Sequence, residues 1–212
     1  MKWISGFIVL SSVVLMLTGC EQAEQPVADE PAMPEVVAAP GETESTVVTV
    51  APMDQTVAES AMNGDIVAVK QALAKGLDIN AVDEGKRTLL MFACFNGHTE
   101  LAKFLIGAGA AVDQREKTNR TALMFAATGP NVDTVKMLIE MGAEVNAIDS
   151  HEDWTALMIA SAEGQTEVVN LLLANGADAT MKDTDGEDSA YFARQRKFEA
   201  LAQVLDKAAA SK

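Results

Sequence analysis

The chain has 212 residues, of which 49% are apolar and only 5% aromatic, and its formal net charge is −15. This length allows one mid-sized domain with accessory segments, and the abundance of alanine favours closely packed helices over a sheet sandwich. So acidic a surface repels nucleic acid and anionic lipid headgroups, which excludes nucleic acid as a partner. The net negative charge either serves solubility alone or indicates a basic partner.

Residues 1–19 have the features of an export signal. Lys2 provides a positive start, and residues 7–17 form an apolar run of signal-peptide length, too short for a confident membrane span. The run ends in the sequence LTGC at residues 17–20, which resembles the lipobox of bacterial lipoproteins. The resemblance implies that residues 1–19 are removed and that Cys20 carries the acyl chains of a membrane anchor. The alternatives are an ordinary signal peptide or an uncleaved anchor with a chance cysteine.

The lipoprotein resemblance also predicts a location. Aspartate after the lipidated cysteine often retains such proteins in the inner membrane, and this chain has Glu21 there. We therefore expect a protein of the bacterial cell envelope, lipid-anchored at the outer membrane and facing the periplasm.

The segment 20–53 joins this anchor to the rest of the chain. Residues 21–52 contain seven acids, five prolines and no Lys or Arg. Because prolines remove backbone donors and like charges repel, the composition predicts a disordered, extended tether that spans roughly 30 Å. The run TVVTV at residues 46–50 could add a strand to a partner, pack on the first helix or have no structural role.

From residue 54 onward the sequence repeats itself with a period of 33 or 34 residues. Thr88, Thr121 and Thr155 each begin an apolar stretch (TLLMFA, TALMFA and TALMIA), and glycines at 76, 109, 142 and 176 each follow a second apolar stretch. The threonines suit the N-caps of first helices. Gly97 and Gly164 suit a left-handed residue in the turn to a second helix.

These motifs resemble the ankyrin repeat family, in which Gly-His marks the inter-helix turn and Gly-Ala-Asp follows the second helix. The second unit has GHTE at residues 97–100, and the fourth has GQTEVV at 164–169 and GAD at 176–178. The resemblance implies an all-α solenoid of about five stacked helix–turn–helix units joined by β-hairpin loops, the outer two acting as caps. We place this domain at residues 54–208, followed by a tail at 209–212.

The chain departs from the family pattern at several positions. Each threonine is followed by Leu or Ala where the family has proline, and the third unit has GPNV at residues 129–132 in place of Gly-His, which leaves its turn geometry open. Met91, Met124 and Met158 replace the family histidine; we interpret them as core residues, with a Cu(I) site as the alternative. Cys94 is interpreted as a buried, inert thiol, with a redox-sensitive site as the alternative.

No catalytic motif stands out from the repeat background. The sequence contains no nucleophile–base set, phosphate loop or paired carboxylates with recognisable spacing. His98 falls at a turn-packing position, and the acidic run at residues 183–188 has its glycine at the wrong offset for a calcium loop. We therefore expect a monomer that is not an enzyme, with no cofactor, no metal site and no small-molecule substrate.

Ankyrin domains bind partners on a concave face made of hairpin tips and first helices, and the residue before each threonine often contacts the partner. Those positions and the inserted fourth hairpin supply the predicted partner-binding residues: Arg87, Arg120, His151, Glu152, Asp153, Trp154 and Glu187. Trp154 is the leading candidate because exposed Trp and Arg dominate binding energetics, the alternative being that it covers its own helix.

The sequence as a whole predicts a lipid-anchored, extracytoplasmic scaffold that holds a protein partner. The alternatives are an inhibitor or protective partner of an envelope enzyme, for example in oxidative-stress defence, a metal-handling protein, and a purely structural spacer.

Overall fold

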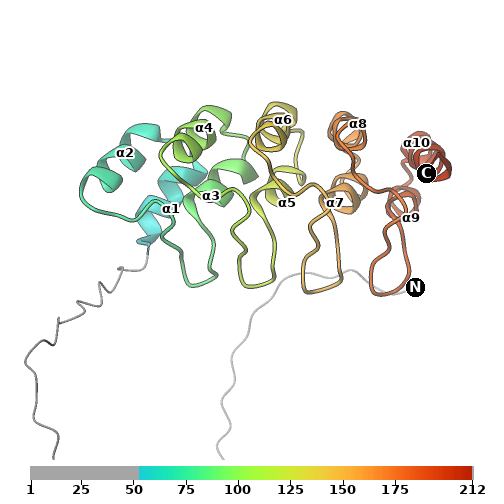
Figure 1. Cartoon of the computed structure of the whole chain (residues 1–212), viewed down its shortest axis with the longest axis horizontal. Helices are drawn as coiled ribbons and strands as arrows, with labels where there is room; N and C mark the ends of the chain where they lie inside the picture. The colour runs from blue at the N-terminus through green and yellow to red at the C-terminus, as the bar shows by residue number, and fades with distance from the viewer. Residues whose placement is uncertain (1–52, 212) are drawn as a thin grey trace, which may run out of the picture. The chain divides into compact units, whose positions relative to one another are not determined.

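The computed structural model describes residues 53–211, which form ten α-helices and no named strand. The predicted signal, Cys20 and the predicted tether up to residue 52 lie outside the described residues. Five first helices make an inner layer: α1 (Gln55–Met62), α3 (Leu89–Phe95), α5 (Ala122–Ala126), α7 (Ala156–Ala162) and α9 (Ser189–Gln195). Five second helices cover them: α2 (Ile66–Ala74), α4 (Thr99–Gly107), α6 (Val132–Glu140), α8 (Thr166–Ala174) and α10 (Glu199–Ala210). Figure 1 shows the two layers and the loops that project below them, as the five-unit solenoid predicts.

The first helices begin at the predicted threonines, but only two of the three threonines act as side-chain caps. The hydroxyls of Thr88 and Thr155 accept hydrogen bonds from the backbone N–H groups of Met91 (3.3 Å) and Met158 (3.2 Å). Thr121 occupies the N-cap of α5 without a side-chain cap bond, and its buried Oγ1 has no hydrogen-bond partner within the described part of the chain. The expectation of three equivalent caps is therefore wrong for Thr121.

The inter-helix turns follow the prediction in the second and fourth units and differ in the third. Gly97 and Gly164 have φ values of 72° and 70°, in the left-handed region that glycine enters without strain. In the third unit Pro130 falls at the corresponding position, and its ring holds φ negative. The chain therefore turns by another route: α5 ends early, at Ala126, and the amide of Gly129 bonds to the Ala126 carbonyl.

The core lies between the two layers and is continuous along the array. Leu90, Leu123 and Leu157 are each 1% exposed and repeat at the same position of successive units. The three methionines that we interpreted as core residues, Met91, Met124 and Met158, are buried, as is Cys94, the free cysteine of the described residues. Because a single unit cannot bury its apolar face alone, this continuous core depends on the stacking of neighbouring units.

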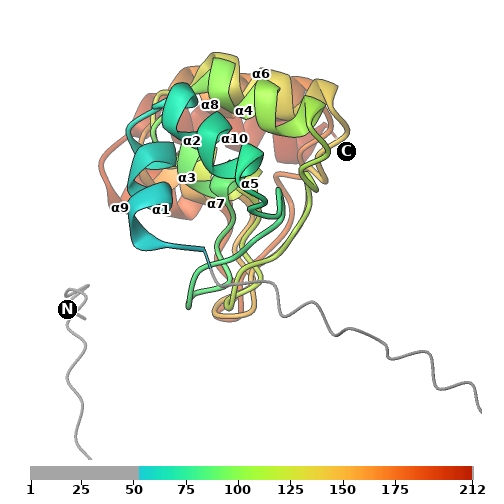
Figure 2. The same cartoon turned by 90° about the vertical axis from the view of Figure 1, so that its left-hand side faces the viewer.

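The four loops between units are hairpins, and an equivalent backbone hydrogen bond closes each of them. The amides of Asp83, Glu116, Asp149 and Asp183 donate to the carbonyls of Arg87, Arg120, Trp154 and Glu187, at 3.0–3.1 Å. The third closure spans one residue more than the others, which is where the sequence has its insertion. Figure 2, an end-on view, shows that all four hairpins project on the same side of the helices.

Successive hairpins are also joined to each other through the backbone. The amide of Lys117 donates to the carbonyl of Gly85 (3.0 Å), that of Ser150 to Thr118 (2.8 Å), and that of Thr184 to Glu152 (3.1 Å). Side chains reinforce the same junctions deeper in the loops, since the Asn80 Oδ1 accepts from the Ala111 amide at 2.8 Å. These bonds fix the spacing of the repeats along the hairpin side.

The folded unit extends slightly past the boundaries expected from the sequence. Met53, placed at the end of the tether, is 5% exposed and its amide bonds to the Val82 carbonyl at 3.1 Å. At the other end α10 continues to Ala210, because Ala208 and Ala209 still pack against the core. Within residues 53–211 no helix has the length and apolar character needed to cross a membrane.

Candidate functional site

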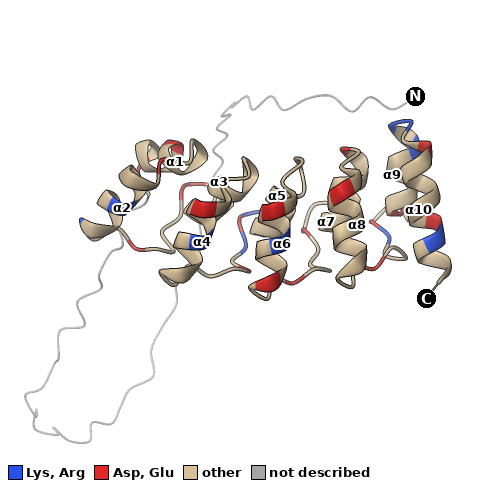
Figure 3. Cartoon of the chain, turned by 90° about the horizontal axis from the view of Figure 1, so that it is seen from above, with Lys and Arg blue, Asp and Glu red and all other residues tan. Residues whose placement is uncertain are grey.

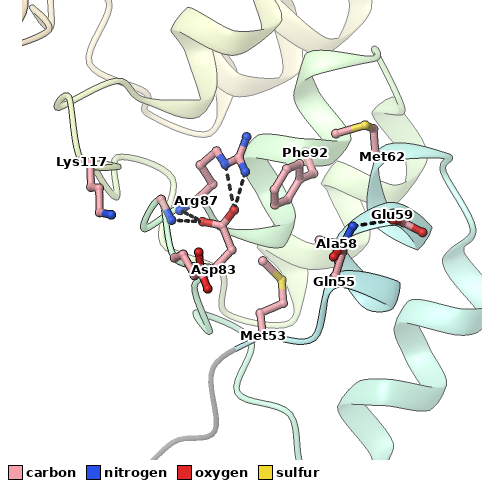
Figure 4. Close-up of a pocket in the computed structure, with 11 residues that line it drawn as sticks. Met53, Gln55, Ala58, Glu59, Met62, Asp83, Arg87, Phe92 and Lys117 are labelled. Atoms are coloured by element: carbon pink, nitrogen blue, oxygen red, sulfur yellow. Dashed lines mark hydrogen bonds and ion pairs between the residues drawn. The ribbon is translucent and has the colours of Figure 1, made fainter. Parts of the chain in front are cut away.

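The hairpins and the first helices enclose a groove that runs across the first four units. It consists of three hollows of about 790, 80 and 180 Å³. The first and second share Met62, Arg87 and Phe92, and the second and third share Phe95 and Phe125, so the hollows adjoin one another in a row. Figure 4 shows the largest hollow, between the start of α1 and the first hairpin.

Aromatic side chains from neighbouring repeats form the apolar wall of the groove. Phe92 of α3 and Phe125 of α5 occupy the same position of successive units, and Ile159 of α7 continues the row. Phe95 meets Phe125 edge to face, with ring centroids 6.3 Å apart, yet remains 43% exposed. An exposed aromatic on a folded surface costs solvation that a bound partner would recover.

Arg87 lines the groove, but its charge is engaged within its own hairpin. Its Nη2 lies 2.6 Å and its Nε 2.8 Å from Asp83 Oδ2, so the pairing uses two guanidinium nitrogens. The guanidinium carbon also lies 4.9 Å from the centroid of the Phe92 ring. Figure 4 shows this arrangement, in which Arg87 forms one side of the hollow and Phe92 another.

Arg120, at the same position of the next unit, pairs with a different hairpin. Its Nε donates to Asp149 Oδ2 at 3.2 Å, and the Asp149 side chain is only 1% exposed. The other oxygen of Asp149 accepts the amides of His151, Glu152 and Trp154 at 3.1–3.2 Å. This buried carboxylate therefore orders the inserted hairpin and also orients Arg120 along the groove.

Trp154 lies at the C-terminal end of the groove and is half-buried. Its ring packs on Phe192 of the fifth unit, with centroids 4.5 Å apart, so it covers part of the next repeat. It also lines the third hollow together with Arg120, Phe125 and Glu163. The indole Nε1 is buried with no hydrogen-bond partner within residues 53–211.

The other predicted contact residues lie away from the groove lining. His151 and Glu152 are exposed at the tip of the inserted hairpin, where His151 Nδ1 and Glu152 Oε1 are 3.6 Å apart. Asp153 has a φ of 60°, so its backbone forms the left-handed residue of that turn. Glu187 closes the last hairpin, and its carboxylate accepts a hydrogen bond from the exposed Tyr191 hydroxyl, which raises the pKa of that tyrosine. The structure thus brings Arg87, Arg120 and Trp154 together in one groove and leaves these four outside it.

Sequence reasoning missed most of the apolar lining of the groove. Met62, Phe92, Phe95 and Phe125 belong to the first helices. Phe92 and Phe125 were counted only as members of the repeat motif, and Met62 and Phe95 were not singled out. One signal was available: a large apolar residue recurs four places after each threonine, at Phe92, Phe125 and Ile159. Glu163, which ends α7 and lines the third hollow, carried no such signal.

The described residues offer binding surfaces more readily than reactive groups. No three of their His, Cys, Asp or Glu side chains are grouped so as to hold a metal ion. Burial in the apolar core raises the pKa of the Cys94 thiol far above its usual range, so its reactive thiolate is scarce at neutral pH.

Two family models match the chain, and both describe ankyrin repeats: one covers residues 57–149 and the other residues 142–191. Together they span well over half of the 212 residues, and the helical architecture agrees with them throughout. The chain therefore belongs to the ankyrin repeat family, whose members are typically protein-binding scaffolds without catalytic activity. No curated protein shows significant similarity to the chain.

Proposed function

We propose that this protein is a lipid-anchored scaffold, displayed in the bacterial cell envelope outside the cytoplasm, that holds a protein partner in the groove and catalyses no reaction. The observation that carries the binding role is the row of adjoining hollows along α1, α3, α5 and α7, with Phe95 left exposed on its wall. Binding interfaces concentrate their energy in such aromatic positions.

The anchoring part of the proposal is supported by the sequence LTGC at residues 17–20 and by the apolar run before it. Acylation at Cys20 and the absence of aspartate at position 21 favour the outer membrane, with the domain on the periplasmic side. Labelling of growing cells with palmitate tests this directly, because Cys20→Ser removes the attachment site. Label that persists in Cys20→Ser refutes the anchor and leaves the binding role standing.

The binding role is tested by crosslinking in intact cells followed by capture of the full chain. Phe95→Ser removes an exposed aromatic from the groove and is expected to reduce the yield of the crosslinked partner about tenfold. Val67→Ser is the matched control, because Val67 is 60% exposed on α2 in the outer layer and does not line the groove. If both variants and the wild type capture the same amount of partner, the partner binds outside the groove. If none of them captures a specific partner, the protein acts only as a structural spacer.

A further inference from the structure

The charges along the groove do not balance. Its lining includes four acids and three bases: Glu59, Asp83, Glu84, Glu163, Arg87, Lys117 and Arg120. Asp83 neutralises Arg87, and the buried Asp149 neutralises Arg120; among residues 53–211 these are the ion pairs at the groove. Of the charged residues that line the groove, Lys117 in the first hollow is then the one base left against three acids, Glu59, Glu84 and Glu163.

The charge of the whole domain has the same sign. Residues 53–211 contain 24 Asp and Glu against 14 Lys and Arg, a net charge of −10. Such a field concentrates cationic groups near the surface and repels anionic ones. It also disfavours the chain's own residues 21–52 as occupants of the groove, since they carry seven acids and no Lys or Arg.

The third hollow has the dimensions and walls of a pocket for one side chain. Its volume of about 180 Å³ is below the ~300–1,000 Å³ of small-molecule sites. Phe95, Phe125 and Trp154 supply aromatic surface, and the carboxylate of Glu163 lies exposed at the edge. Aromatic faces attract cations, and an aliphatic stem can pack on the same rings.

We propose, on the basis of the proposed binding function, that the partner presents a basic, apolar segment to the groove and inserts one Lys or Arg side chain into the pocket between Phe125, Trp154 and Glu163. Apolar residues of the segment pack on Phe92 and Phe95. Four stacked helices at a spacing of about 10 Å make a groove of about 30 Å. An extended segment of about ten residues spans that length.

Arg120 does not turn this pocket into an anion site. Its guanidinium already donates to Asp149, which is buried and accepts three backbone amides besides. A partner carboxylate would compete with that arrangement and would also approach Glu163. A partner cation gains Glu163 and the aromatic walls while the Arg120–Asp149 pair stays intact.

The test is selection of binders from a random library of displayed peptides by the purified full chain, followed by affinity measurements on synthetic copies. We expect enriched peptides to combine Lys or Arg with apolar residues. Glu163→Gln should weaken their binding about three- to fivefold at low ionic strength, and the loss should shrink at high salt because the contact is partly exposed. Trp154→Leu should weaken it about fivefold through loss of aromatic surface.

Glu167→Gln is the matched control, since it removes the same charge from the same repeat but from the first turn of α8 in the outer layer. Figure 3, a view from above, shows acidic residues in that layer at the corresponding ends of α4, α6 and α8. Binding by basic peptides should be unchanged in this variant.

Three outcomes overturn the inference: enrichment of acidic or uncharged peptides, basic peptides that bind Glu163→Gln as well as the wild type, and a library that yields no binder. None of them removes the proposed function, because capture of a partner through Phe95 in cells is measured separately. Conversely, if the cells yield no captured partner while the library still yields basic peptides, the proposed role in cells is refuted, and the preference of the pocket for a basic side chain stands.

Discussion

Thr121 allows a sharp test, because the same residue type sits at the start of three helices in two different bonding states. At positions 88 and 155 the hydroxyl caps its helix, with distances of 3.3 and 3.2 Å to the backbone nitrogens. At position 121 the hydroxyl is buried and unpartnered among the described residues. Threonine to valine replaces the hydroxyl by a methyl group of similar size, so the substitution measures the hydroxyl and little else.

The expected changes in unfolding free energy have opposite signs. Loss of a cap costs about 1 kcal/mol, so Thr155→Val should be destabilised by that amount. A buried hydroxyl without a partner costs about 1–3 kcal/mol to desolvate, so Thr121→Val should be stabilised by about 1 kcal/mol. For a domain of this size 1 kcal/mol shifts Tm by about 2–4 °C. The two variants should therefore differ by about 6 °C.

Circular dichroism during thermal and urea unfolding of the full chain is the appropriate assay, with Thr88→Val as a second member of the capped class. The midpoint of Thr121→Val should rise while those of Thr88→Val and Thr155→Val fall. The reasoning is refuted if Thr121→Val loses as much stability as Thr155→Val, because its hydroxyl must then be bonded in solution.

Three further predictions concern other positions of the fold. Asp149→Ala should lower the unfolding free energy by about 3 kcal/mol. Asp149→Asn should lower it by clearly less, since asparagine keeps an acceptor for the three backbone amides. Equal losses of stability in urea unfolding would contradict this role of the Asp149 carboxylate. Lys86 has a φ of 62°, so Lys86→Gly should raise the free energy of unfolding by about 0.5–1 kcal/mol through relief of backbone strain; an unchanged Tm would mean that the strain is absent. The thiol of Cys94, studied in the Cys20→Ser chain, should resist alkylation between pH 7 and 9 and react fully in denaturant, because its folded pKa is raised by burial; fast labelling of the native chain would show an accessible thiolate.

The architecture was predictable because the period, the threonines and the glycines are all local signals in register. Five units, an all-helical fold and the burial of the three motif methionines follow from them and are confirmed. The different inter-helix turn of the third unit, at residues 129–132, was also indicated by the sequence, since Pro130 cannot adopt the left-handed turn conformation of Gly97.

The lining of the groove was not predictable to the same degree, because it depends on relations between repeats. Phe92 and Phe125 have the spacing of core residues, and only the stacking of units decides that they also face the groove. Arg87 and Arg120 are equivalent in the repeat, yet one pairs within its hairpin and the other across to Asp149. Trp154 was expected as an exposed contact residue but is half-buried at the end of the groove, where Phe192 of the fifth unit covers part of its ring.

The backbone hydrogen bonds between hairpins have a mechanical consequence. They hold residues 85, 118 and 152 at fixed separations from the loops that follow, whereas the outer helices are held together mainly by side chains that can repack. Bending of the array is therefore expected to open or close the gaps between α2, α4, α6, α8 and α10 while the hairpin row keeps its length. A partner that lies along the groove therefore meets hairpins at a constant spacing. The side chains that anchor it must match that spacing, because the scaffold does not change it.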